Sequence, residues 1–366
     1  MKHFVFFWTF LGVLFTSVGC SNQSTEPNST PQPEDEWPFD PPSSEPLNAF
    51  EMNAKIGRGL NIGNALEAPA EGDWGIIIRD DYIRLIAEAG FNSIRLPVTW
   101  PTRTETSPPF TIDPKFFERV DHIVQEALKH GLVVILNNHH FDELNENPQA
   151  HQQWLMRIWQ QLSRHYKDYP DELYFEILNE PHGAFNNNAS VWNTMAQEIL
   201  AEIRKLNPHR MVVIGPIGWN AIDQLNTLDL PEDDRGIIAT YHFYLPFQFT
   251  HQGASWVGEQ SNDWLGTPWV GSLEERLFIT DKFDAAVAWA QTENRPLFMG
   301  EFGAYSAADD NSRYRWTDFV ARSAEKRGIS WTYWEFGAGF GVYNRDKGEW
   351  RPLLLKALIP ESSETE

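Results

Sequence analysis

Residues 175–181 read FEILNEP, an apolar run that ends in an amide, a carboxylate and a proline. A proline has no N–H to give to a strand ladder, so we expect a β-strand to stop before it and to leave Asn179 and Glu180 at the strand's carboxyl end. Residues 297–303 read LFMGEFG and repeat the pattern with Glu301. Two strands that each deliver a glutamate at the carboxyl end indicate a sheet whose polar site lies along that edge.

Eight β-rich runs of this kind alternate with longer amphipathic stretches along the chain. They cover Gly59–Ile62, Ser93–Leu96, Val133–Leu136, Leu173–Ile177, Val212–Gly215, Ile238–Tyr241, Leu297–Met299 and Ser330–Tyr333. Asp113–His130 and Ser312–Arg327 lie between such runs and are predicted as helices. The first begins with an N-cap Asp followed by proline, and a C-cap glycine, Gly131 or Gly328, follows each of them. The chain lacks the glycine fingerprint of a dinucleotide-binding sheet, so we predict an α/β fold, a single (β/α)8 TIM barrel.

In a TIM barrel the carboxyl ends of the strands converge on one face, and that face carries the active site. Polar and aromatic residues follow the predicted strands there: Asn64, Arg95, His139, Asn179, Glu180, His242, Tyr244, Glu301 and Trp334. Two carboxylates on one face suit hydrolysis of a glycosidic bond, because one can protonate the leaving oxygen while the other attacks or activates water. Alternatively, Glu180 and Glu301 each only pair with a basic group such as Arg95. Glu176 is predicted to be a buried structural carboxylate.

The composition restricts the partner. A formal charge of −22 argues against nucleic acid or an anionic polysaccharide, which need a basic surface, although an acidic surface can also serve solubility alone. Sixteen Trp and ten Tyr supply aromatic faces that suit the apolar C–H faces of sugar rings. The expected partner is a neutral β-linked polysaccharide or oligosaccharide, with no cofactor and no metal, and the protein is expected to act as a monomer.

The N-terminus has the pattern of an export signal. Phe4–Val18 is apolar over the length of a signal-peptide core, which is too short for a membrane span. Ser17-Val18-Gly19-Cys20 resembles a lipoprotein processing site, although Ser17 stands where the pattern prefers Leu. Cys20 is the only cysteine in the sequence, so it has no partner for an intramolecular disulfide, and lipidation is the use expected for it. We predict a lipoprotein-type signal peptide over residues 1–20 and an outer-membrane or cell-surface lipoprotein, the alternative being a secreted soluble protein.

The rest of the chain divides by composition. Residues 21–46 are mostly Ser, Thr, Pro, Asn, Asp and Glu, which cannot bury enough apolar surface to fold, so they are predicted to form a disordered linker. The catalytic domain is predicted over residues 47–359. A polar tail over residues 360–366 is expected to follow it.

Three longer motifs stand at or after predicted strands. They are GRGLNIGNALE at residues 57–67, ILNEP at 177–181 and YWEFGAGFG at 333–341. Together they resemble glycoside hydrolase family five, from Phe50 to about Leu358, and most closely its branch of bacterial and thermophilic endoglucanases that also cleave mannan. The resemblance implies a retaining endo-β-1,4-glycanase acting on cellulose-type β-glucan and glucomannan, with Glu180 as the acid/base and Glu301 as the nucleophile.

Physical reasoning agrees with these two roles. Arg95 can keep Glu301 ionised through charge-assisted hydrogen bonds, and Tyr244 can donate another. Glu180 must stay protonated near neutral pH, which requires a raised pKa, and His242 is expected to orient it.

Other side chains are expected to bind the sugar. The resemblance implies this role for Asn64, Glu67, His139, His140, His251, Trp256 and Trp334. Trp334 would form the floor of the cleavage subsite, and Asn179 would present its amide to the 2-hydroxyl of the sugar there. A zinc site at His139 and His140 is disfavoured, because adjacent residues on a strand point to opposite faces.

Other functions remain open on the sequence alone. The chain could be primarily a β-mannanase, or a non-catalytic carbohydrate-binding lipoprotein on the same barrel. Loss of either glutamate would be the sign of the second, and both are present. A metal-dependent deacetylase that uses the histidines would lose its activity with a chelator.

Overall fold

The computed structural model describes residues 37–361. The predicted signal peptide, Cys20, most of the predicted linker and residues 362–366 of the predicted tail lie outside the described residues. The chain divides into a unit from Met1 to Pro38 and a compact unit that begins at Phe39. Within the described residues, the helices are all too short or too polar to cross a membrane.

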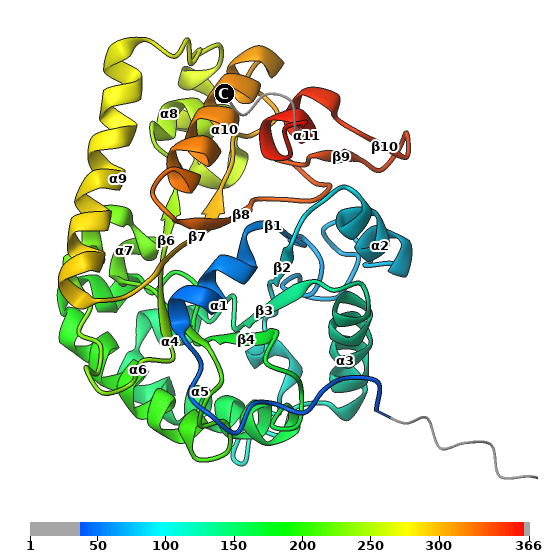
Figure 1. Cartoon of the computed structure of the whole chain (residues 1–366), viewed down its shortest axis with the longest axis vertical. Coiled ribbons are helices and arrows are strands. Elements are labelled where there is room, and N and C mark those ends of the chain that lie inside the picture. Colours follow the sequence, from blue (N-terminus) through cyan, green and yellow to red (C-terminus); the bar gives the residue numbers. More distant parts are fainter. Residues whose placement is uncertain (1–36, 362–366) are drawn as a thin grey trace, which may run out of the picture. The chain divides into compact units, whose positions relative to one another are not determined.

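Eight parallel strands form a closed barrel in the order β1 to β8 (Figure 1). They are β1 (Arg58–Asn61), β2 (Ser93–Leu96), β3 (Val133–Asn137), β4 (Leu173–Glu176), β5 (Val212–Ile214), β6 (Ile237–Phe243), β7 (Leu297–Phe302) and β8 (Ser330–Tyr333). Leu60 of β1 pairs with Ile94 of β2 and with Tyr333 of β8, and the second pairing closes the sheet. The predicted (β/α)8 barrel is therefore confirmed.

Helices surround the barrel and connect its strands (Figure 1). They are α1 (Ala49–Ile56), α2 (Asp80–Glu88), α3 (Pro114–Lys129), α4 (Asp142–Glu146), α5 (Pro148–His165), α6 (Ala189–Arg204), α7 (Ile217–Asn220), α8 (Phe247–Thr250), α9 (Leu273–Glu293), α10 (Asp310–Glu325) and α11 (Pro352–Leu358). Five short 3-10 turns, η1 to η5, lie in the loops among the described residues, and β9 (Tyr343–Asn344) pairs with β10 (Glu349–Trp350) after the barrel.

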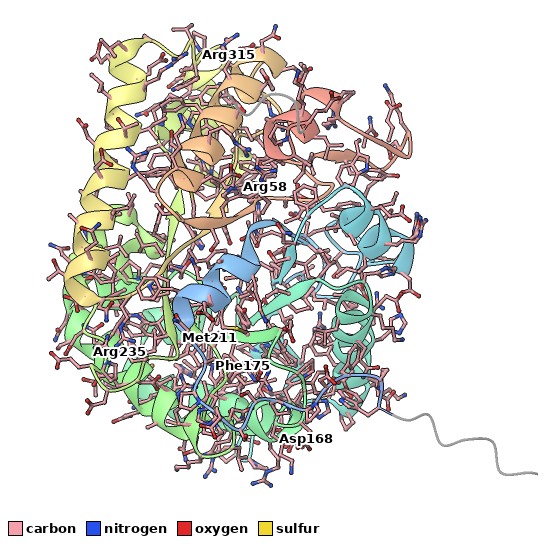
Figure 2. All side chains as sticks on the ribbon, viewed as in Figure 1. Arg58, Asp168, Phe175, Met211, Arg235 and Arg315 are labelled. Carbon is pink, nitrogen blue, oxygen red and sulfur yellow. The ribbon has the colours of Figure 1, made fainter. Side chains whose placement is uncertain are left out.

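Helix α1 covers the amino-terminal end of the barrel. Its buried residues Met52 and Ile56 belong to one apolar cluster with side chains from the starts of the strands, such as Val133, Ile238 and Phe298. Met211, labelled in Figure 2, belongs to the same cluster. Because this end is filled with apolar side chains, the carboxyl end is the one left for polar chemistry.

The predicted elements differ from the observed ones mainly at their ends. Strand β7 runs to Phe302, three residues past the predicted end, so Glu301 lies within the strand. Helix α3 begins at the predicted proline, and the Asp113 carboxylate accepts from the backbone N–H of Lys115 at 2.9 Å. Helix α10 begins two residues before the predicted Ser312, because Asp309 caps it.

The compact unit extends into the segment predicted as linker. The compact unit begins at Phe39, eight residues before the predicted Leu47. Phe39 packs against the main apolar core, and the backbone N–H of Ser43 donates to both carboxylate oxygens of Asp171, at 3.0 and 3.1 Å. Composition missed this segment because one aromatic ring and one distant carboxylate, rather than a run of apolar residues, hold it to the barrel.

This boundary predicts the effect of truncation. A chain that starts at Leu47 loses the Ser43–Asp171 hydrogen bonds and the Phe39 contacts, and its free energy of unfolding should fall by about 1–3 kcal/mol. Urea denaturation followed by tryptophan fluorescence measures the difference. Equal midpoints for the chains that start at Phe39 and Leu47 would restore the boundary expected from composition.

Candidate active site

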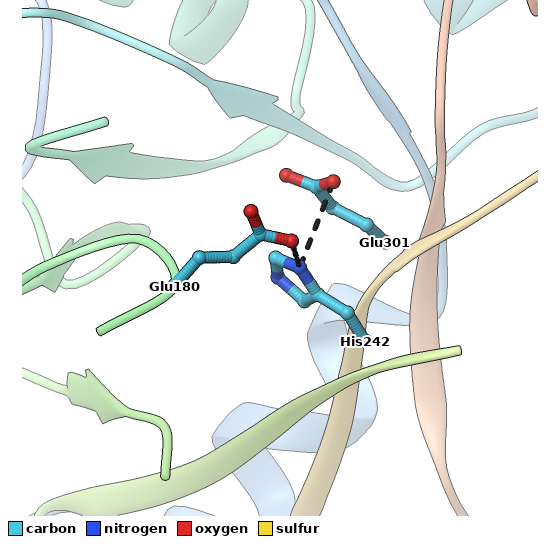
Figure 3. Close-up of side chains that lie close together, drawn as sticks. All are labelled: Glu180, His242 and Glu301. Carbon is cyan, nitrogen blue, oxygen red and sulfur yellow. Dashed lines mark hydrogen bonds and ion pairs between the residues drawn. The ribbon is translucent and has the colours of Figure 1, made fainter. Parts of the chain in front are cut away.

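Two glutamates face each other at the carboxyl end of the barrel (Figure 3). Glu180 follows β4 in the left-handed backbone region, with φ +50°, and Glu301 comes from β7. One carboxylate oxygen of each, together with a ring nitrogen of His242, lies within 4.8 Å of the others. Retaining glycosidases hold their carboxyl groups about 5–5.5 Å apart and inverting ones about 6.5–9.5 Å, so oxygens this close to each other suit the retaining class better than the inverting one.

Arg95 of β2 is fully buried, and its guanidinium binds four side chains. It donates to both oxygens of Glu176 at 2.6 and 2.7 Å and to Oε1 of Glu301 at 2.6 Å. It also donates to the side-chain oxygens of Asn61 and Asn179, at 2.9 and 2.7 Å. The expected contact between Arg95 and Glu301 is thus present. Glu176 is buried against Arg95, in agreement with its predicted role as a buried structural carboxylate.

The carboxylate of Glu301 receives hydrogen bonds on both oxygens. Besides Arg95 on Oε1, the Tyr244 hydroxyl donates to Oε2 at 2.8 Å, and Nδ1 of His242 lies 3.6 Å from the same oxygen. Burial raises the pKa of Glu301, whereas His242, Arg95 and the Tyr244 hydrogen bond oppose the rise. An acceptor of two strong hydrogen bonds is suited to act as an ionised nucleophile.

Glu180 has fewer donors. Its Oε1 lies 2.7 Å from Nδ1 of His242, and about a quarter of its side chain (26%) is exposed to the cleft. Burial raises the pKa of Glu180 to about 7, while burial lowers the pKa of His242 to about 4. Near neutral pH the imidazole is therefore uncharged and Glu180 can hold a proton, as a general acid must.

A metal cation bound between Glu180, His242 and Glu301 would be repelled by a nearby positive charge. These three residues form a geometrically possible metal group among the described residues. The Arg95 guanidinium, however, already lies 2.6 Å from Glu301 and would repel a second positive charge. The arrangement is better described as two carboxyl groups that share hydrogen bonds with Arg95, Tyr244 and His242 than as a metal site.

Several residues that the sequence predicts to bind sugar form ring contacts near the two glutamates. Trp334 lies parallel to His139, with ring centroids 5.5 Å apart and planes at 6°. A Cβ on Gly63 would stand 2.7 Å from the Trp334 ring, so only glycine fits beneath this side chain. His140 contacts Trp74 edge-on at 5.9 Å. Since β3 ends at Asn137, both histidines follow the strand and can serve the same cleft.

Asn64 and Glu67 lie in the turn after β1, but they differ in how accessible their side chains are to a bound sugar. Glu67 is 3% exposed, and its carboxylate accepts from the backbone N–H of Asn64 and, at 3.0 Å, from that of Ala65. Burial raises the pKa of Glu67 to about 7. Glu67 therefore shapes the turn, whereas Asn64, with φ +62°, stands at its partly exposed bend.

A cavity of about 570 Å³ opens beside Glu180. Its lining includes Glu180, Trp219, His242, Tyr244, Phe247, His251 and Trp256. His251 is 7% exposed and stacks on Phe247 at 4.1 Å, whereas Trp256 is 61% exposed. A second cavity, of about 490 Å³ beside Leu47 and Met211, lies at the amino-terminal end of the barrel, away from both glutamates.

The sequence interpretation missed several residues of this site. Trp219 is 52% exposed and stacks on His182, with ring centroids 4.9 Å apart and planes at 13°. Asn61, Trp74 and Phe247 were also missed. Trp219 follows the fifth predicted strand, so the rule that placed the other residues at strand ends could have found it.

Two closely spaced carboxyl groups in unequal environments, at the carboxyl end of a (β/α)8 barrel and beside exposed aromatic rings, are the arrangement of a glycoside hydrolase. The chain belongs to glycosyl hydrolase family 5. The family model described as cellulase (glycosyl hydrolase family 5) matches residues 50–339.

The chain is similar to known endoglucanases. Endoglucanase H of Acetivibrio thermocellus is 36% identical over 341 residues; the match covers 91% of this chain but only 36% of that protein's length. Endoglucanase B of Clostridium cellulovorans is 27% identical over 335 residues, with 84% of this chain and 74% of that protein covered. Structures of Thermotoga maritima Cel5A in complex with mannotriose and with cellobiose are 45% and 46% identical to this chain. Each has a TM-score of 0.83, and each match covers 85% of this chain and 100% of the other.

The environment of Glu180 predicts a pH dependence. Its proton is present below the pKa of about 7 and lost above it, so kcat/KM should fall as the pH rises through about 7. Glu180→Gln should strongly lower kcat/KM on cello-oligosaccharides, whose departing oxygen needs the proton, and the pH profile of its residual activity on the same substrate should lack this alkaline limb. Initial rates from pH 4 to 9 measure both profiles. An unchanged limb in the Gln variant would assign it to another group.

Proposed function

We propose that this chain is a retaining endo-β-1,4-glycanase that hydrolyses cellulose-type β-glucan and glucomannan. The observation that carries the proposal is the close pair of glutamates in unequal environments. Glu301 attacks the anomeric carbon while Glu180 protonates the departing oxygen, and a glycosyl ester forms on Glu301. Glu180 then takes a proton from water, which attacks the same carbon and breaks the ester bond. The anomeric configuration is retained because two inversions follow one another.

Aromatic faces on both sides of the scissile position support internal cleavage. We assign the rings of Trp334, His140 and Trp74 to the glycone side and the cavity with Trp219 and Trp256 to the leaving-group side. A chain that binds across both sides is cut away from its ends. The names of the relatives, endoglucanase H and endoglucanase B, agree with this mode of action.

The choice between glucan and mannan depends on one hydroxyl. Glucose and mannose differ in the orientation of the 2-hydroxyl, which Asn179 is expected to contact. Arg95 donates to Oδ1 of Asn179 at 2.7 Å, so Nδ2 is the atom left to face the sugar. An amide donor can meet a hydroxyl in either orientation when His139 and His140 share the contact. The Thermotoga maritima Cel5A complexes contain both cellobiose and mannotriose, which supports tolerance here too.

We expect activity on both backbones. The kcat/KM on manno-oligosaccharides should lie within about a hundredfold of that on matched cello-oligosaccharides, a difference of less than about 3 kcal/mol in transition-state binding. Proton NMR of the same reactions should show the β-anomer first. A site that requires one hydroxyl position rejects the alternative by about 10⁴–10⁵, so a gap of that size would contradict the proposal. Initial release of the α-anomer would contradict the role of Glu301.

A mannan preference of the same size would instead make the chain primarily a β-mannanase. If the protein hydrolyses none of barley β-glucan, carboxymethylcellulose, glucomannan and mannan, the result would favour a non-catalytic carbohydrate-binding protein with this fold. A buffer with a chelator serves as the control, because a metal-dependent deacetylase would lose activity in it and this enzyme would not.

We also propose that the chain is an exported lipoprotein anchored through Cys20, and that it acts as a monomer. The apolar Phe4–Val18 run and the lone cysteine support the anchor. The full-length chain expressed in a bacterium should partition into the detergent phase of Triton X-114, and Cys20→Ala should partition into the aqueous phase. Equal partition of both would favour an ordinary signal peptide and a secreted enzyme.

A further inference from the structure

The residues after β5 form an unusual backbone turn. Gly218, Trp219 and Asn220 have successive φ values of +71°, +61° and +54°, although only the first is a glycine. Non-glycine residues rarely occupy the left-handed region, and such strain gathers where surrounding structure imposes it for a function. Glu180 itself has φ +50°, so the acid and this turn share the same rare conformation.

Hydrogen bonds attach the turn to the loop that carries the acid. The backbone N–H of Trp219 donates to the carbonyl of Pro181, the residue after Glu180, at 3.2 Å. On the other side of the turn, Ala221 forms a parallel bridge with His242 of β6. The turn is therefore fixed between the acid and the imidazole that contacts it.

This geometry directs the Asn220 side chain to His242. Asn220 is fully buried, and its Nδ2 lies 3.4 Å from Nε2 of His242. A Cβ on Gly215 would stand 2.3 Å from the Asn220 side-chain oxygen, so the side chain fits only because residue 215 is glycine. That oxygen has no hydrogen-bond partner among the described residues. An acceptor without a partner is commoner in proteins than a donor without one, which favours the orientation with Nδ2 toward the ring.

Three groups thus lie in sequence: Asn220 at Nε2 of His242, and Nδ1 of the same ring 2.7 Å from Oε1 of Glu180. We propose that Asn220 is a positioning residue that fixes the tautomer of His242 and thereby the location of the acid's proton. Because Nε2 accepts from Asn220, the imidazole proton is on Nδ1 and is donated to Oε1. The catalytic proton must then be on Oε2 of Glu180, which has no hydrogen bond within the described part of the chain and faces the cleft.

The other tautomer would withdraw that proton. With the ring proton on Nε2, Nδ1 would accept the O–H of Glu180 and hold the proton away from the departing oxygen. The titratable and charged groups around the ring are Glu180, Glu301, Glu176, Arg95, Tyr244 and His139. Burial lowers the pKa of His242 to about 4, so the imidazole is neutral near pH 7. A neutral imidazole carries one proton, which lies on either Nδ1 or Nε2. Asn220 is the described residue that acts on Nε2.

Two variants distinguish the proposed effect of Asn220 on the His242 tautomer from its contribution to packing. Asn220→Asp keeps the side-chain shape and tolerates the left-handed backbone, but it replaces the donor with an acceptor. Asn220→Gly keeps the backbone freedom and removes the side chain. Asn187→Asp adds the same charge at an exposed position on η2 (Gly183–Asn187) and serves as the control.

The direct measurement is ¹⁵N NMR of the His242 ring in protein labelled at histidine, at pH 6. The wild-type ring and the Asn187→Asp ring should carry the proton on Nδ1, and the Asn220→Asp ring should carry it on Nε2 or on both nitrogens. An Nε2-protonated ring in the wild type, or the same tautomer in Asn220→Asp, would overturn the proposal. This measurement is independent of turnover, so it can fail while the proposed hydrolase function holds.

The kinetic measurement rests on the proposed function. General acid catalysis contributes about 10²–10⁴-fold, so a misplaced proton should lower kcat/KM on cello-oligosaccharides by about tenfold or more in Asn220→Asp. Aryl glycosides with a good leaving group should lose less than about threefold, because they need little protonation. The kcat/KM of Asn220→Gly on cello-oligosaccharides should lie between the values for Asn220→Asp and the wild type. Equal losses on both substrates would indicate a structural role and overturn the proposal.

Discussion

The guanidinium of Arg95 lies buried between the carboxylates of Glu176 and Glu301, and the rest of the site depends on that one positive charge. A buried charge without a partner is very costly, and Arg95 avoids the cost by donating to carboxylates and amides on every side. Three carboxylates nevertheless share this region once Glu180 is included. One cation cannot neutralise all three, and Glu180, which has the fewest donors, is the carboxyl group best suited to hold a proton.

The closed barrel is what brings these groups together. Arg95 comes from β2, Glu176 from β4, His242 from β6 and Glu301 from β7. In an open sheet strands this far apart in order could not share a site, whereas in a barrel their carboxyl ends meet at one mouth. Helix α1 fills the opposite end with apolar side chains, so the polar residues are concentrated at one end.

Much of this could be predicted from the sequence because the signals are local. An apolar run that ends in Asn179 and Glu180 marks a strand end, and the alternation of strands and helices gives the barrel. What the sequence did not indicate is set by contacts between distant residues. Phe39 joins the domain through a core that forms only on folding, and the Glu67 carboxylate faces its own turn. The left-handed turn at Trp219 has no sequence signal except the preceding glycine, because Trp rarely adopts positive φ.

That turn carries two adjacent side chains with different surroundings. Trp219 and Asn220 are adjacent, yet one is half-exposed in the cavity that would receive the departing sugar and the other is buried against His242. A sugar that stacks on Trp219 would press on the same backbone that fixes the imidazole beside Glu180. Since the turn is also bonded to Pro181, its position and that of the acid cannot change independently. Sugar binding on the leaving-group side and proton donation to the leaving group therefore both depend on the turn at Gly218, Trp219 and Asn220.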